Sequence, residues 1–339
     1  MKNKVMLCGL LIVVQLARIY AVPTEELRNA YKYGAEAKLV YRVVNDKGVP
    51  VSNATAHVWF RSYGRKQDNA DWYVQTDTNG MFVVAHRLNE KFSCSVYKDG
   101  YYQSRDERFY FDTEANTVKD GRWQPYGEVR TVVLKRIINP IPIRRSRHPW
   151  DFSIPAYDEW LGFDFERFAF VKPYGEGKVA DVLMRFALFK PGDAEYHMSM
   201  ELSFTNHPYA GAYLMKKDSC SEMAGVYEAD TNAVFSPCFR YSHDRLPGKR
   251  PIRTRLSSEE YLVFRTRTVL DDKGRLVSAN YGKLYGELHF VGPRGLSLGQ
   301  LDFNLKPNDT NLEDAETARK SRLGYKQQLE FERRRKAGK

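Results

Sequence analysis

The sequence predicts an all-β protein: two antiparallel β-sandwich-type domains joined by a Pro-rich linker and followed by a basic C-terminal helix or tail. Short runs rich in aromatic and β-branched residues recur along the 339-residue chain. Turn-forming residues separate these runs, as they do between neighbouring strands. Helical periodicity is almost absent before residue 310. Runs of this composition favour pleated, half-buried strands.

Residues 1–21 have the layout of a secretory signal peptide. Lys2 and Lys4 precede the apolar run VMLCGLLIVV, and the segment QLARIYA leads to Val22. The apolar run is shorter than the about 20 residues that a membrane-spanning helix needs. We therefore expect a secreted, periplasmic or cell-surface protein with no transmembrane segment after removal of the signal. An uncleaved N-terminal anchor is the alternative interpretation.

Residues 22–137 form the first predicted domain. Its seven candidate strands are AKLVYRVV, ATAHVWF, WYVQT, MFVVAHRL, FSCSVYK, ERFYF and VRTVVLKRI. Seven short strands in about 100 residues, with turn signals between them, are typical of a β-sandwich. Within ATAHVWF, Val58 and Phe60 share one face of the strand and Trp59 lies on the other.

The turns of this domain carry a recognisable pattern. GVPV stands at residues 48–51, TDTNGMF at residues 76–82 and KDGYY at residues 98–102. Asp77 can bond the amides of its own turn, and Gly80 can supply a positive φ before the next strand. Over residues 36–136 the pattern resembles the carboxypeptidase regulatory-like (transthyretin-like, Ig-like) β-sandwich. The resemblance implies an accessory module of exported proteins whose turns have no catalytic role.

Residues 138–155 are the predicted Pro/Arg-rich linker. Its sequence INPIPIRRSRHPW contains three prolines and no periodic pattern. Because proline cannot continue a strand ladder and favours extended backbone, this segment is expected to be a semi-rigid connector.

Residues 156–307 form a second β-rich domain of unknown function. Its candidate strands are FAFV, VADVLMRFALFK, YHMSMELSFT, GAYLM, YLVFRTRTVL, RLVSANYGKLYGELHFV and LSLGQLDFNL. In HMSMELSF, apolar and polar residues alternate, which indicates one buried and one solvated face of an antiparallel sheet. DDKG at residues 271–274 is a hairpin turn signal. The second part of the chain is similar to uncharacterised exported bacterial proteins that pair the first module with a C-terminal β domain.

Residues 308–339 are predicted to be a basic helical or disordered tail, with Asn311 as the N-cap of its helix. Residues 319–339 contribute +7 to the net charge of +11, and the signal segment contributes +3. The body between them is nearly neutral, which argues against a nucleic-acid partner. The tail is then a solvated end, or alternatively an anchor for acidic surface polymers.

Three cysteines follow the signal segment. Cys220 and Cys238 flank a polar segment and are candidates for a disulfide, which an exported chain can form. Such a bridge would stabilise the fold by about 3 kcal/mol. Cys94 alternates with polar residues in FSCSVYK and is expected to be a buried thiol in the core.

Two common catalytic motifs are missing from the sequence: it contains no His-Glu-x-x-His and no P-loop. The nearest match to a zinc-binding His-x-x-Glu pair is His148-x-x-Asp151, in the predicted linker. We therefore expect no catalytic residues, no metal and no cofactor. The alternative is a hydrolase of glycoside or peptide bonds, using acids near Asp164 as an acid/base pair. The candidate acids are Asp158, Glu159, Asp164 and Glu166.

Several aromatic residues are candidates for ligand binding, because aromatic rings can stack on sugars or peptides. Trp59 qualifies by its face of the strand, unless a second layer covers that face. Tyrosines beside glycines indicate either an aromatic platform or a tight turn with a β-bulge. The candidates are Trp59, Trp72, Tyr73, Tyr174, Tyr281 and Tyr285. The predicted function is a non-catalytic exported binding or structural protein that contacts a glycan or a protein at the cell envelope.

Overall fold

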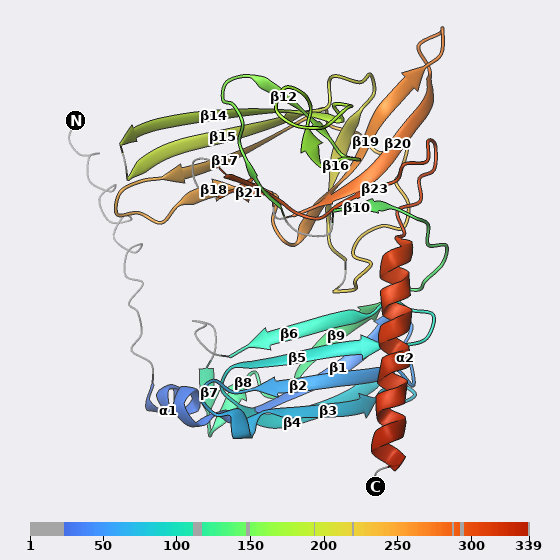
Figure 1. Cartoon of the computed structure of the whole chain (residues 1–339). Coiled ribbons are helices and arrows are strands. Elements are labelled where there is room, and N and C mark those ends of the chain that lie inside the picture. The colour runs from blue at the N-terminus through green and yellow to red at the C-terminus, as the bar shows by residue number, and fades with distance from the viewer. Residues whose placement is uncertain are drawn as a thin grey trace, which may run out of the picture.

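The computed structural model describes residues 24–110, 117–146, 150–192, 194–218, 220–286, 288–291 and 295–337. Two β domains lie one above the other in Figure 1, and helix α2 (Ala315–Ala337) runs from the upper domain along the lower one. The predicted all-β class with a C-terminal helix is confirmed. No helix in the described ranges is long and apolar enough to cross a membrane. The predicted signal peptide, residues 1–21, lies outside these ranges.

The N-terminal domain is a sandwich of two sheets, preceded by helix α1 (Glu25–Tyr33), which was not predicted. Its strands are β1 (Ala35–Asn45), β2 (Thr55–Arg61), β3 (Ala70–Gln75), β4 (Met81–Leu88), β5 (Lys91–Tyr97), β6 (Ser104–Phe109), β7 (Thr117–Lys119), β8 (Arg122–Gln124) and β9 (Glu128–Leu134), with a short 3₁₀ turn at Lys66–Asp68. One sheet has the order β4-β1-β8-β7 with β9 beside β1, and the other has the order β3-β2-β5-β6. Each of the seven predicted strands is present. The pairing of β1 with β8 and β9 is parallel, which departs from the antiparallel expectation.

Alternating side chains fill the space between these two sheets. Val58 and Phe60 of β2 are fully buried, and Tyr41 of β1 stacks on Phe82 of β4 with ring centroids 4.8 Å apart. The turn before β4 forms as its residues predict, since Asp77 accepts hydrogen bonds from the backbone amides of residues 79 and 81. The sandwich therefore follows directly from period-two burial.

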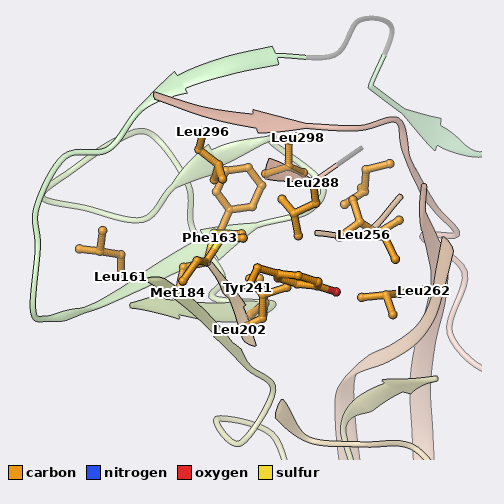
Figure 2. Close-up of a cluster of buried hydrophobic side chains, with 14 of the residues drawn as sticks. Leu161, Phe163, Met184, Leu202, Tyr241, Leu256, Leu262, Leu288, Leu296 and Leu298 are labelled. Atoms are coloured by element: carbon orange, nitrogen blue, oxygen red, sulfur yellow. The ribbon is translucent and has the colours of Figure 1, made fainter. Parts of the chain in front are cut away.

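The C-terminal domain packs three antiparallel sheets around a second core. Its strands are β10 (Arg144–Arg145), β11 (Trp150–Ser153), β12 (Trp160–Asp164), β13 (Ala169–Phe170), β14 (Val182–Gly192), β15 (Glu195–Ser203), β16 (Gly211–Lys216), β17 (Cys238–Arg245), β18 (Ile252–Thr254), β19 (Glu260–Leu270), β20 (Leu276–Tyr285), β21 (His289–Phe290), β22 (Gly295–Leu298) and β23 (Leu301–Phe303). The sheets have the orders β10-β23-β20-β19-β16, β13-β12-β14-β15-β17-β18 and β11-β22-β21. Figure 2 shows Met184, Leu202, Leu262 and Leu296, which come from all three sheets, in this core. The predicted turn at residues 271–274 joins β19 to β20.

Much of the predicted linker belongs to the C-terminal domain. Strand β10 pairs with β23, and β11 pairs with β22. Prolines 140 and 142 lie before β10, so they interrupt no ladder. Of His148-x-x-Asp151, the nearest match to a zinc-binding pair, His148 lies outside the described residues.

The chain passes between the domains twice, and the two crossings run side by side. The Ile141 amide donates to the carbonyl of Glu313, and the Ala315 amide donates to the carbonyl of Ile141. The Glu313 side chain is 1% exposed and accepts hydrogen bonds from the Tyr102 hydroxyl at 2.9 Å and from the backbone amides of residues 138 and 139 at 2.7 and 2.6 Å. One carboxylate thus joins the end of the N-terminal domain to both crossings.

A buried ion cluster lies beside these crossings. Arg145 forms a bidentate pair with Asp302 at 2.7 and 2.8 Å and a further pair with Asp314 at 2.9 Å. Asp314 also accepts a hydrogen bond from the Thr317 amide at 2.8 Å, so it caps helix α2. The expected N-cap, Asn311, is therefore wrong. Its side chain instead accepts a hydrogen bond from the Glu313 amide and donates one to the carbonyl of residue 139.

Helix α2 is docked on the N-terminal domain along one side. The Ser321 hydroxyl accepts a hydrogen bond from the Gln103 amide at 3.1 Å, and the Phe331 ring lies 4.8 Å from that of Tyr73. A Cβ on Gly324 would come within 3.1 Å of the Tyr97 ring, so the helix approaches β5 closely. The interpretation of residues 319–339 as a solvated end is therefore wrong for this side of the helix.

The three described cysteines are free thiols, and the expected Cys220–Cys238 disulfide is absent. Cys220 lies at the domain boundary, where its carbonyl accepts a hydrogen bond from the Arg105 amide of β6. Cys238 begins β17 in the six-stranded sheet, with its sulfur 3.8 Å from the Ser203 hydroxyl. Nearness in sequence therefore did not bring the two thiols together. Cys94 is buried in the core, as predicted.

We predict that Glu313→Ala lowers the free energy of unfolding by about 3–5 kcal/mol, because three buried donors lose a charged acceptor. Urea unfolding followed by circular dichroism measures the change. The control is Glu330→Ala, which removes a carboxylate paired with Arg334 on the exposed surface of α2. Equal losses of stability in both variants would contradict the role of Glu313 in joining the two domains.

A second prediction concerns Lys283, which is 0% exposed. Burial, together with the charges of Arg145 and Lys135, lowers the pKa of its ammonium group to about 8, although Asp302 opposes the shift. In the unfolded chain, a lysine side chain has a pKa near 10.4. Between these values the unfolded state binds more protons, so stability rises with pH. Relative to Lys283→Met, the native protein should gain about 2–3 kcal/mol from pH 8 to pH 10.4 in urea unfolding. Parallel stability curves for the two proteins would refute this.

Candidate functional site

The N-terminal domain carries a hollow of about 280 Å³ on the outer face of the β3-β2-β5-β6 sheet. We call it the outer groove. Because Val58 and Phe60 face the core, the alternation of β2 turns Trp59 and Arg61 outward into this groove. The residues that line it are Trp59, Arg61, Lys91, Ser93, Cys94, Ser95, Arg105 and Glu107.

Two serines of β5 form the floor of the outer groove. Ser93 lies opposite Trp59 of β2 on one side and opposite Glu107 of β6 on the other. Ser95 has Arg105 opposite it on β6. Strands are spaced about 4.8 Å apart, so the walls on β2 and β6 stand roughly 10 Å from each other. Small hydroxyl-bearing residues between larger ones produce a trough along β5.

The wall on the β2 side is aromatic. The Trp59 ring lies 4.3 Å from the His57 ring, which stacks on Tyr73 at 4.3 Å with the planes 8° apart. Phe331 of helix α2 extends this series beyond Tyr73. Burial lowers the pKa of His57, and the Arg61 charge lowers it further, while Asp71 at 3.5 Å opposes the shift. These effects favour the neutral form of the imidazole, and its ring continues the aromatic wall.

The wall on the β6 side is charged and hydrogen-bonded. The Ser93 hydroxyl donates to Glu107 at 3.1 Å, and the Lys91 ammonium lies 3.6 Å from the same carboxylate. Arg105 pairs with Glu222 of the C-terminal domain at 3.4 Å. This wall therefore offers both donors and an acceptor to a polar ligand.

Helix α2 limits the groove at the end near Ser95. Gln103, whose amide bonds Ser321 of the helix, donates from its side chain to the Ser95 hydroxyl at 3.2 Å. Figure 1 shows α2 passing beside the ends of β3 and β5. The C-terminal helix thus completes a site that is otherwise built from the N-terminal domain.

Two of the six predicted aromatic candidates meet in this wall, namely Trp59 and Tyr73. Trp72 lies on the opposite face of β3 and packs edge-on against Phe60 at 4.8 Å, so it belongs to the core. Period-two alternation requires this, since neighbours on a strand face opposite ways.

The other three aromatic candidates lie in the C-terminal domain. Tyr281 and Tyr285 are buried in its core, and the Tyr285 hydroxyl donates to the carbonyl of Ala224. Tyr174 is partly exposed and donates to Glu159 at 2.6 Å. None of the three reaches the outer groove. In contrast, His57, Ser93, Ser95 and Arg105 were missed, because their meeting depends on which strands pair and not on a sequence motif.

Asp164 and Glu166, two acids of the hydrolase alternative, are engaged in structural contacts. Asp164 is buried and accepts hydrogen bonds from four backbone amides, those of residues 166, 167, 178 and 179. Burial alone would raise its pKa, but these amides reverse the effect and hold the pKa below its usual range. Glu166 and Asp181 both pair with Arg267 at 2.8 Å. No group of three or more potential metal ligands occurs within the described ranges.

Neither a protein-family model nor a curated protein sequence matches the chain. Among solved structures, 3-chlorocatechol 1,2-dioxygenase from Rhodococcus opacus is 12% identical with a TM-score of 0.25, over 31% of this chain and 61% of the dioxygenase. A catechol 1,2-dioxygenase from an Acinetobacter species is 15% identical with a TM-score of 0.24, over 32% of this chain and 54% of that enzyme. The chain thus spans less than two thirds of these enzymes.

A candidate carbohydrate binding protein from Bacteroides uniformis is 10% identical with a TM-score of 0.18, over 80% of this chain and all of that protein. At such TM-scores these likenesses carry no argument about fold or function. The resemblance to the carboxypeptidase regulatory-like sandwich stays a prediction.

Proposed function

We propose that the protein is an exported, non-catalytic binding protein that holds a glycan in the outer groove, at the cell envelope. Export rests on the signal peptide expected at residues 1–21. The binding role rests on one observation: Trp59 stands beside a floor of serine hydroxyls, with charged side chains on the opposite wall.

This arrangement suits the chemistry of a sugar ring. A pyranose has C–H groups on its faces and hydroxyls around its edge, so one face can pack on the indole of Trp59. Ser93, Arg105 and Glu107 then supply hydrogen-bond donors and acceptors for the hydroxyls. An apolar surface with a few placed polar groups is the usual composition of a small-ligand site.

A glycan fits the size of the outer groove better than a protein partner does. Its volume of about 280 Å³ is near the lower limit of known ligand pockets. A stable protein interface buries about 800 Å² on each partner, which a trough of this width does not supply by itself. Hydrolysis is less favoured, because Asp164 is fully bonded to backbone amides and its carboxylate holds no proton to donate at neutral pH.

We predict that Trp59→Ala weakens binding to glycans about 10-fold or more, since it removes the stacking surface. A glycan array with the chain lacking residues 1–21 identifies ligands, and calorimetric titration of the best of them measures the affinity. The control is Trp160→Ala, which removes a tryptophan that is 44% exposed on the C-terminal domain. Unchanged affinity of Trp59→Ala for every ligand found would overturn the proposal.

A further inference from the structure

One end of the outer groove holds two positive charges side by side. Arg61 of β2 lies directly opposite Lys91 of β5. Like charges in this cross-strand position destabilise a sheet. Lys91 has a loose ion pair with Glu107 at 3.6 Å. Among the described residues no acidic side chain pairs with the Arg61 guanidinium. The cluster therefore carries more positive charge than its own surroundings neutralise.

We propose that the glycan bound in the outer groove carries an anionic group, a carboxylate or a sulfate ester, which is held between Arg61 and Lys91. This inference rests on the proposed function and names the substrate class of the same site. Directly opposite residues have their Cβ atoms about 5 Å apart, so two long side chains can reach one group. The planar guanidinium of Arg61 can contact two oxygens of the group at once, and the Lys91 ammonium adds a point charge.

The position of the charge pair specifies where the anionic group lies. Arg61 follows Trp59 by two residues on the same face, which places it about 7 Å further along the strand. The group therefore belongs to the sugar that stacks on Trp59 or to its immediate neighbour. Glu107 stands opposite Ser93 in the middle of the groove and would repel an anion there. The glycan is thus oriented with its charged end toward Lys91.

The test uses pairs of oligosaccharides with one backbone: a uronate-containing form with its carboxyl-reduced neutral counterpart, and a sulfated form with its desulfated counterpart. Calorimetric titration of the chain lacking residues 1–21 should show at least 10-fold tighter binding of one acidic form. The acidic pair that shows this preference identifies the group as carboxylate or sulfate. Arg61→Gln and Lys91→Gln should each weaken binding of the acidic form about 10-fold more than binding of its neutral counterpart.

The control is Arg42→Gln, which removes the same charge from an exposed position on β1, in the other sheet of the domain.

A second measurement, thermal unfolding, needs no ligand. Arg61→Gln should raise the midpoint of thermal unfolding, because it removes the like-charge pair, whereas a purely structural arginine would lower it. Equal affinity for acidic and neutral forms, unaltered when Arg61→Gln and Lys91→Gln are combined in one variant, would overturn the anionic assignment.

The outcomes also separate this inference from the proposed function. If Trp59→Ala abolishes binding of neutral glycans while the charge variants have no effect, the groove binds sugars and only the anionic assignment fails. If no acidic or neutral oligosaccharide binds the native protein, both proposals fail.

Discussion

The architecture depends on burying two adjacent carboxylates where the chain crosses between domains. Glu313 and Asp314 are both nearly inaccessible to solvent, and an uncompensated buried charge would cost several kcal/mol. Each is compensated by several donors: Glu313 by a tyrosine hydroxyl and two backbone amides, and Asp314 by Arg145 and the first turn of α2. These contacts form only when both domains and both crossings are in place. We call Glu313 and Asp314 with their bonded partners the interdomain joint. The joint therefore favours one arrangement of the domains.

Helix α2 connects this arrangement of the domains to the outer groove. Asp314 starts the helix at the joint, and the docked side of the helix then meets β5 and β3 near residues 321–331. The contact is made by small or polar residues such as Ser321 and Gly324, which allow close approach but bury little apolar area. The position of α2 thus relies more on its capped start than on its own packing. A change at the joint would therefore shift α2 and alter the end of the groove near Ser95, which the helix limits.

The two-residue alternation of side chains along a strand explains which features of the fold could be predicted from the sequence and which could not. Alternation located the strands, turned Trp59 outward and placed Cys94 in the core, because these are properties of single strands. The Cys220–Cys238 pairing failed because it required knowledge of which sheets the two cysteines join. The docked side of α2 was hidden for a related reason, since a stripe of small and polar residues gives no apolar periodicity. The groove itself depends on pairing between β2, β5 and β6, which no local pattern encodes.

The outer groove contains a cross-strand pair of residues that is unfavourable for the stability of the sheet. In the same sheet, Val58 and Cys94 face each other in the core, and Ser93 bonds Glu107 on the surface. Arg61 opposite Lys91 is instead a like-charge pair beside a hollow that also holds an outward tryptophan. Sequences tend to break local rules at functional sites, where a ligand supplies what the fold lacks. An anion between these two side chains would turn an unfavourable contact into a charge-assisted one. Stability and recognition would then have opposite requirements at this one position.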